Sequence, residues 1–290
     1  MHQKSHTLFV VTGIIAGLLF IQAQIDSAAQ AEGEETVVKV ADAKIGNAEV
    51  SHPIDPAIEM AKGGRKRCNG EVRDYTATLV RRERVNGQLK DHEYIFAKVR
   101  NRLIEDGKIV SPFSVYMYFL KPATVKGREL VYTEGQNKGK FCVHEKGIVL
   151  PSLWLNPEAP IAMKGQRYPM TKFGIQNLVD QMIVRAEEDR LHDECRVQFR
   201  KGAEINGRKC TVVQIFHPKR RAHFDYHVAQ IFIDDELKLP VRYAAYDWPT
   251  KVGARPQLLE EYTYVNIKVN VDLTDMDFDP KNPEYNFNIK

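Results

Sequence analysis

The feature that most constrains this chain is an alternation of apolar and polar residues, which runs through most of its length after residue 70 and is interrupted by short turn sequences. Alternation with a period of two is typical of β-strands, because successive side chains point to opposite faces of the sheet. Asn86-Gly87 and Asn206-Gly207 each separate two such segments, and Asn-Gly is favoured in two-residue hairpin turns. Strands joined by turns this short pair antiparallel, so we predict an antiparallel sheet.

The first Asn-Gly turn also predicts a register, because a two-residue loop fixes which residues of its strands lie opposite each other. Around Asn86-Gly87 we expect Ala77 opposite Phe96 and Arg82 opposite Asp91. An opposite-charge pair across two strands stabilises a hairpin. We therefore interpret Arg82 as a structural residue and not as a ligand-binding arginine.

Two of the four cysteines lie in or beside the second hairpin. Its loop places Cys210 opposite Ala203, and Cys195 is then about eight positions out of register with Cys210. Side chains that far apart cannot form a disulfide. A bond between Cys68 and Cys142 stays open as an alternative to buried free thiols, and the cysteine spacing matches no zinc motif.

The segment 114–120 is apolar on both faces of its predicted strand. The two alternating sets are Val115, Met117 and Phe119 on one face and Tyr116, Tyr118 and Leu120 on the other. Such a strand is covered on both sides or lines a cavity on one of them. Further strands are predicted at 128–134, 139–145, 192–200, 208–217, 227–234, 239–247 and 259–271.

Two helices accompany the strands. One is predicted to begin at Asp55-Pro56, since Asp is favoured at an N-cap and Pro in the first turn, and to weaken at Gly63-Gly64. The other spans 171–189, where apolar residues recur at helical spacing and form one stripe. This stripe must lie on the sheet. We therefore predict an α+β, mainly β fold with a curved antiparallel sheet or incomplete β-barrel under a helical lid.

The N-terminus has the features of an export signal. A basic start precedes an apolar run from Leu8 to Ile21, which is shorter than the roughly 20 residues of a membrane-spanning helix. Ala29-Gln30-Ala31 has the form that signal peptidase cuts, so we predict cleavage after Ala31, with Ala23 or a retained membrane anchor as alternatives. The predicted organisation is a signal peptide over 1–31, a flexible linker over 32–52 and one domain over 53–290, in the periplasm or cell envelope.

Composition and motifs exclude several functions. The 42 Lys and Arg are nearly balanced by 38 Asp and Glu, unlike the clustered positive charge of a nucleic-acid binder. No nucleophile elbow, phosphate-binding loop, HExxH helix or dinucleotide fingerprint occurs, so we expect no enzyme activity, no cofactor and no metal. A basic turn at Lys219, Arg220 and Arg221 is interpreted as simply exposed, with transient contact of these three residues with an anionic membrane surface as the alternative.

Three polar clusters receive a structural interpretation. The histidines that flank the basic turn are His217, His223 and His227. The positive charge between them opposes a metal ion. The alternating aspartates of 275–279 imitate a calcium loop but lack its glycine, so we expect Met276 and Phe278 to point inward. We interpret the acidic run 187–189 as the solvated end of the second helix.

The predicted strands contain more aromatic and apolar side chains than are required to cover one buried face of a sheet. A curved sheet closed by a helix forms a concave apolar pocket, and the alternative is a filled core. The strand residues predicted to line this pocket are Val115, Tyr116, Met117, Tyr118, Phe119, Tyr132, Phe141, Phe232, Tyr262 and Tyr264. The lid-helix residues predicted to close it are Ile175, Leu178, Val179 and Met182.

Several stretches resemble known sequences. The segments DYTATLVRRERVNGQL, KVR, PFSVYMYFLKP and KGRELVYTEGQNKGK are similar to an uncharacterised family of secreted bacterial proteins, classed as a domain of unknown function. The ending EYTYVNIKVNVDLTDMDFDP resembles the close of the LolA/LolB-like lipoprotein carriers. Together these stretches cover roughly residues 60–285. The resemblance implies an incomplete antiparallel barrel with a helical lid, whose apolar interior takes lipoprotein acyl chains in the carriers.

The leading functional hypothesis is a secreted, non-enzymatic envelope protein that binds a lipid, a lipoprotein acyl chain or another lipidated partner in the concavity. The alternative is a protein-interaction or envelope-stress sensor module that binds an envelope protein and has a filled core. A hydrolase ranks third, and would require carboxylates or histidines that converge in a cleft.

Overall fold

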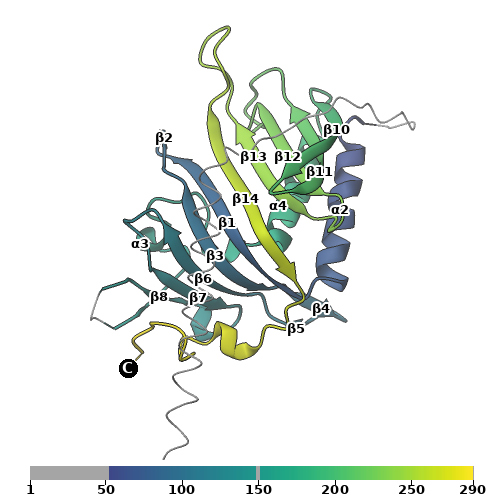
Figure 1. Cartoon of the computed structure of the whole chain (residues 1–290). Helices are drawn as coiled ribbons and strands as arrows, with labels where there is room; N and C mark the ends of the chain where they lie inside the picture. Colours follow the sequence, from purple (N-terminus) through teal and green to yellow (C-terminus); the bar gives the residue numbers. More distant parts are fainter. Residues whose placement is uncertain (1–51, 148–150, 290) are drawn as a thin grey trace, which may run out of the picture.

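The alternating segments form one long antiparallel sheet in the computed structural model, which describes residues 52–147 and 151–289 (Figure 1). The predicted signal peptide, its cleavage sites and nearly all of the predicted linker lie outside the described residues. The strands lie side by side in the order β10 (Arg196–Ile205), β11 (Arg208–Phe216), β12 (Val228–Asp234), β13 (Pro240–Tyr246), β14 (Leu258–Val269), β1 (Asp74–Val85), β3 (Glu93–Arg100), β6 (Ser114–Lys121), β7 (Glu129–Thr133), β8 (Phe141–His144) and β9 (Leu153–Leu155).

The sheet is open, because β10 and β9 are its two ends and do not pair with each other. Short β2 (Gln88–Leu89) extends the hairpin of β1, and β4 (Leu103–Glu105) pairs with β5 (Lys108–Ser111) in a separate hairpin. The predicted mainly β, antiparallel and incompletely closed architecture is therefore confirmed. Strand β9 was not predicted, because Leu153-Trp154-Leu155 is too short to show a period.

Two long helices cover one face of the sheet, which we call the helix-covered face. They are α2 (Asp55–Gly70) and α4 (Ile175–Asp189), while α3 (Pro160–Met163) is a single turn. The expected weakening of the first helix at Gly63-Gly64 is wrong, because α2 continues through both glycines to Gly70. Gly64 lies where α2 meets its neighbours: a Cβ there would be 3.9 Å from Val179 Cγ2 and 3.7 Å from the carbonyl oxygen of Lys238. No helix in the described part of the chain is long and apolar enough to cross a membrane.

Replacing Gly63 with alanine is expected to stabilise the fold. Nothing lies within 4 Å of a Cβ built at this helical position, so the change removes about 0.5–1 kcal/mol of backbone entropy cost without a clash. Urea unfolding measures the gain. Gly87→Ala is the matched control: its surroundings are equally open but its φ is +78°, so it should destabilise the protein. A loss of stability in Gly63→Ala would contradict the account of α2.

The first hairpin follows the predicted register only beside its turn. Val85 lies opposite Gln88 as expected, but further along the pairing has shifted by one residue, so that Ala77 lies opposite Ala97. The shift arises between β2 and β3, where the three residues 90–92 lie opposite only two residues of β1, Arg82 and Glu83. The predicted pairing of Arg82 with Asp91 is therefore wrong. Arg82 Nε donates to the carbonyl oxygen of Lys90 at 2.9 Å.

The second hairpin has the predicted register, with Ala203 opposite Cys210. All four cysteines are buried free thiols, so a Cys68–Cys142 disulfide is not formed. The physical reason is that these two side chains belong to clusters on opposite faces of the sheet: Cys68 packs in the core under the helices and Cys142 in the core of the other face.

The second face, opposite the helices, is covered near β6 and β7 by the C-terminal segment 273–289. Tyr285 stacks on Tyr116 with 3.9 Å between ring centroids, and Phe278 is buried beside them. Met276 is 51% exposed, so the expectation that both residues point inward is wrong for Met276. The segment Asp275–Phe278 is a 3-10 helix, in which residues two apart do not share a face as they would in a strand.

Candidate functional site

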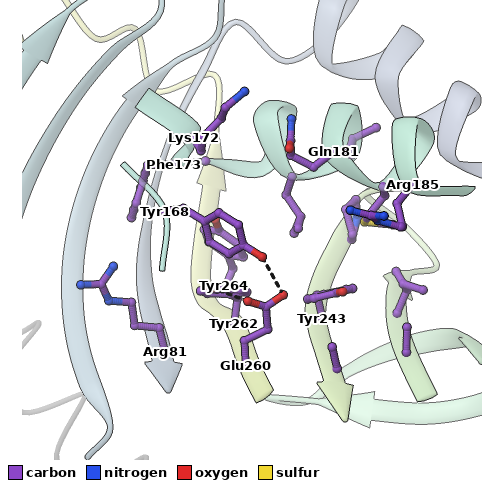
Figure 2. Close-up of a pocket in the computed structure, with 18 of the residues that line it drawn as sticks. Arg81, Tyr168, Lys172, Phe173, Gln181, Arg185, Tyr243, Glu260, Tyr262 and Tyr264 are labelled. Carbon is purple, nitrogen blue, oxygen red and sulfur yellow. Dashed lines mark hydrogen bonds between the residues drawn. The ribbon is translucent and has the colours of Figure 1, made fainter. Parts of the chain in front are cut away.

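A cavity of about 300 Å³ lies between the helix-covered face of the sheet, helices α2 and α4, and the segment 166–174 (Figure 2). Its volume is within the range of small-molecule pockets. Most of its wall is apolar. The strands contribute Leu79, Met117, Phe119, Leu130, Val213, Ile215, Ile231 and Ile233, and the helices contribute Met60, Leu178, Val179 and Met182.

Half of the residues predicted to line a pocket line this cavity. They are Met117, Phe119, Tyr262, Tyr264, Leu178, Val179 and Met182. Another four pack in the same core without reaching the cavity wall, and these are Val115, Tyr132, Phe141 and Ile175. Whether any of them binds a ligand stays a prediction.

The pocket-lining prediction is wrong for Tyr116, Tyr118 and Phe232, which lie on the opposite face. Because Met117 and Phe119 face the cavity, their neighbours Tyr116 and Tyr118 must face away from it. In the same way Phe232 alternates with the cavity-lining Ile231 and packs in a separate cluster.

One end of the cavity carries a pair of buried carboxylates. Glu83 of β1 and Glu260 of β14 lie directly opposite each other across the two strands, and each is 5% exposed. Tyr262 donates its hydroxyl to Glu83 Oε1 at 2.7 Å. Tyr168 donates its hydroxyl to Glu260 Oε1 at 3.2 Å, as Figure 2 shows. Burial raises the pKa of Glu260, and the nearby charge of Glu83 raises it further.

Arg167 joins the loop between β9 and α4 to this carboxylate pair. Its Nε lies 2.7 Å from Glu260 Oε2, and its backbone N–H donates to Glu83 Oε2 at 3.0 Å. Its guanidinium also donates to the carbonyl oxygen of Arg84 at 3.3 Å. These contacts hold the segment that follows α3 over the cavity, so the lid consists of this segment as well as α4.

Glu83, Arg167, Tyr168 and Glu260 were not predicted from the sequence as site residues. The sequence did contain a signal for Glu83. Leu79, Arg81 and Glu83 alternate along one strand, so their side chains lie on the same face of it. Because Leu79 is apolar and faces the core, the charged Arg81 and Glu83 must face the core as well. Arg167 and Tyr168 lie in an irregular segment without a period, and nothing in the sequence places them over the sheet.

A second buried polar group lies at the C-terminal end of α4. The Tyr226 hydroxyl donates to Asp189 Oδ2 at 2.6 Å, and His217 Nε2 lies 3.5 Å from the same oxygen. The interpretation of 187–189 as solvated is therefore wrong for Asp189, which is 1% exposed. Its position on α4 turns it toward the end of β11, which is directly followed by the fully buried His217. Burial raises the pKa of Asp189 and lowers that of His217.

The basic turn is partly neutralised. Arg221 pairs with Glu194 at 2.5 Å, and Arg220 lies 3.6 Å from Asp247. Contact of Lys219, Arg220 and Arg221 with a membrane stays a prediction. His223 stacks on His192 with 3.6 Å between ring centroids. Within the described residues, no three His, Cys, Asp or Glu side chains are grouped so as to hold a metal ion.

The buried His217 is expected to make the folded protein less stable in mild acid. Its pKa is lowered in the folded state from the ordinary 6.5, so the unfolded chain takes up the proton first and stability falls as the pH drops below about 6.5. Asp189 has the opposite effect on stability. Its pKa is raised in the folded state from the ordinary 3.8, so the folded chain takes up this proton before the unfolded chain does, and acidification then adds stability. In His217→Gln the decline below about pH 6.5 should be smaller than in the wild type, measured by urea unfolding across pH. The control is the exposed His223 changed to Gln: its charge is a smaller cause of the lowered His217 pKa than burial, so this change should alter the slope less, and equal slopes in both variants would contradict the assignment.

Comparison with known proteins identifies one family. The family described as "Protein of unknown function (DUF1571)" matches residues 72–287. A search of curated proteins finds no match.

Several solved structures are similar to this chain at low sequence identity. A DUF1329 family protein from Desulfovibrio piger is 13% identical, with 79% of this chain and 98% of that chain covered and a TM-score of 0.38. The complex of MucA and MucB from Pseudomonas aeruginosa gives 14% identity, 80% and 63% coverage and a TM-score of 0.43, so this chain spans less than two thirds of that one. A LolA superfamily protein from Nitrosomonas europaea gives 9% identity, 76% and 96% coverage and a TM-score of 0.32.

Proposed function

Because this chain belongs to the DUF1571 family, whose description assigns no activity, we propose from its cavity that the protein binds the hydrocarbon chain of a lipid or a lipidated partner. The proposal includes export to the cell envelope, as the N-terminal sequence predicts. The protein holds its ligand and performs no chemistry on it.

The single observation that carries the proposal is a largely apolar cavity between the sheet and the helices that cover it. Protein interiors pack as densely as organic crystals, and voids much larger than a water molecule are few. A cavity of about 300 Å³ lined by Leu, Ile, Met and Phe side chains is therefore a cost to stability unless a ligand fills it. This favours a ligand-binding protein over a sensor module with a filled core.

A hydrolase is not favoured, although Glu83 and Glu260 do converge at the cavity. Both carboxylates are already bound by tyrosine hydroxyls and by Arg167. The cavity wall described by the structure contains no Ser, Thr, Cys or His that could serve as a nucleophile or general base beside them. The largely apolar remainder of the wall also offers few partners to a polar substrate.

Native mass spectrometry tests the proposal on protein exported by its own host and purified without detergent. The expected result is a population whose mass exceeds that of the chain, and which releases a long-chain amphiphile on extraction with organic solvent. A protein that always has the bare chain mass, and that also fails to bind a neutral apolar fluorophore, would contradict it.

A further inference from the structure

The cluster of charged groups at the polar end of the cavity contains more carboxylates than guanidinium groups. Glu83, Glu260, Arg81 and Arg167 line this end, and Glu93 lies outside the cavity wall against Arg81, so that three carboxylates share two guanidinium groups. Arg81 Nε pairs with Glu93 Oε2 at 2.6 Å, and Arg167 Nε pairs with Glu260 Oε2 at 2.7 Å. Glu83 instead accepts hydrogen bonds from a tyrosine hydroxyl and a backbone N–H, while Arg81 acts on it through its field. One negative charge is therefore left without its own cation.

This excess of negative charge determines which ligand head groups the end of the cavity can hold. A carboxylate oxygen can accept more than one hydrogen bond, so both glutamates keep acceptor capacity toward the cavity they line. A buried negative charge is stabilised by a cation and destabilised by a second anion, and the low polarity of the surrounding wall strengthens both effects.

We propose that the carboxylate end of the cavity selects a cationic, hydrogen-bond-donating head group, an amine on a hydrocarbon chain, and rejects a carboxylate head group. The hydrocarbon chain lies along the apolar wall toward Ile215 and Ile231, and the ammonium group lies against Glu83 and Glu260. This inference rests on the proposed function and names the chemical class of its ligand.

The positive groups elsewhere on the cavity wall are weaker determinants. Lys172 and Lys238 are exposed, so water screens their charges. Arg185 is paired with Asp225 and with Glu188. Figure 2 shows Lys172 and Arg185 near α4, at the other side of the cavity from Glu260. These positive groups would favour an anionic head group, whereas the carboxylate end favours a cationic one. The two ends of the cavity therefore predict opposite preferences, which an experiment can distinguish.

The pH dependence of binding follows from the groups that surround Glu260. They are Glu83 and Arg81 of β1, Arg167 and Tyr168 of the lid segment, Tyr262 of β14 and Tyr243 of β13. An ammonium head group requires ionised carboxylates. Affinity for an amine should therefore fall on acidification, starting above the ordinary glutamate pKa of 4.5 because that of Glu260 is raised. Affinity for an alcohol of the same chain length should stay constant over this range.

Competition against a neutral fluorophore tests the inference with dodecylamine, dodecanol and dodecanoate on the full-length mature protein. We expect dodecylamine to bind at least about tenfold more tightly than dodecanoate near neutral pH. Glu83→Gln should reduce this preference by several-fold, and Glu145→Gln, which changes an ion pair with Arg128 outside the cavity, should leave it unchanged.

The outcomes separate the two proposals. Binding of dodecanol with equal or tighter binding of dodecanoate than of dodecylamine overturns the head-group inference and leaves the apolar cavity standing. Binding of none of the three overturns both. If Glu83→Gln does not fold, the pH dependence of the wild-type protein decides, because a constant amine affinity also overturns the inference.

Discussion

Leu178→Trp is expected to lower the affinity of the protein for a hydrocarbon chain by more than about tenfold, because the larger side chain takes space that the ligand needs. Leu178 lies on α4, is only partly buried and lines the cavity. The added indole therefore enters an existing void and does not push into packed atoms, so the folded state should keep its stability. Fluorophore titration gives the affinity, and thermal unfolding checks the fold.

Val184→Trp is the matched control for this variant. Val184 lies on the same helix, is 53% exposed and does not line the cavity, so its replacement should leave the affinity unchanged. If Leu178→Trp binds the fluorophore as tightly as the wild-type protein does, the ligand lies elsewhere.

Asp189→Ala is expected to lower the free energy of unfolding by about 2–4 kcal/mol. The change removes the acceptor of the Tyr226 hydroxyl at 2.6 Å and the partner of the buried His217. Both groups are then left in the core without the carboxylate, and water cannot easily replace it. The loss should extend to ligand binding, because Tyr226 also lines the cavity.

Urea unfolding measures this loss, with Glu187→Ala as the control on the same helix. Glu187 has a 54% exposed side chain and lies 4.0 Å from Lys62, so its removal should change stability by less than about 0.5 kcal/mol. Equal effects of the two variants would show that Asp189 is solvated in solution, as its sequence position alone suggested.

The sequence predicted the architecture well because the fold rests on local signals. Period-two alternation and two Asn-Gly turns determine antiparallel pairing between neighbours, and the apolar stripe of α4 determines which side of that helix packs. The predicted register of the first hairpin is wrong away from its turn, because the bulge that shifts it depends on how β2 and β3 pair with the rest of the sheet. Gly63 and Gly64 did not end α2, because packing of the helix against α4 outweighs the low helix propensity of glycine.

The site was predicted only where it is apolar. Met117 and Phe119 follow from strand alternation, but the choice of which face of β6 carries the cavity depends on where the C-terminal segment packs. Glu83 and Glu260 are far apart in sequence and become neighbours only through the pairing of β1 with β14. No turn or short loop sets that long-range pairing, so the carboxylate pair could not be found from local pattern.

The most direct test of the central claim is a crystal structure of the protein soaked with dodecanol that carries a bromine atom at its far end. The account predicts an anomalous bromine peak inside the cavity, with the chain beneath Leu178 and Met182 of the lid helix. A bromine found only on the surface, or a cavity that closes and stays empty in the soaked crystal, would contradict it.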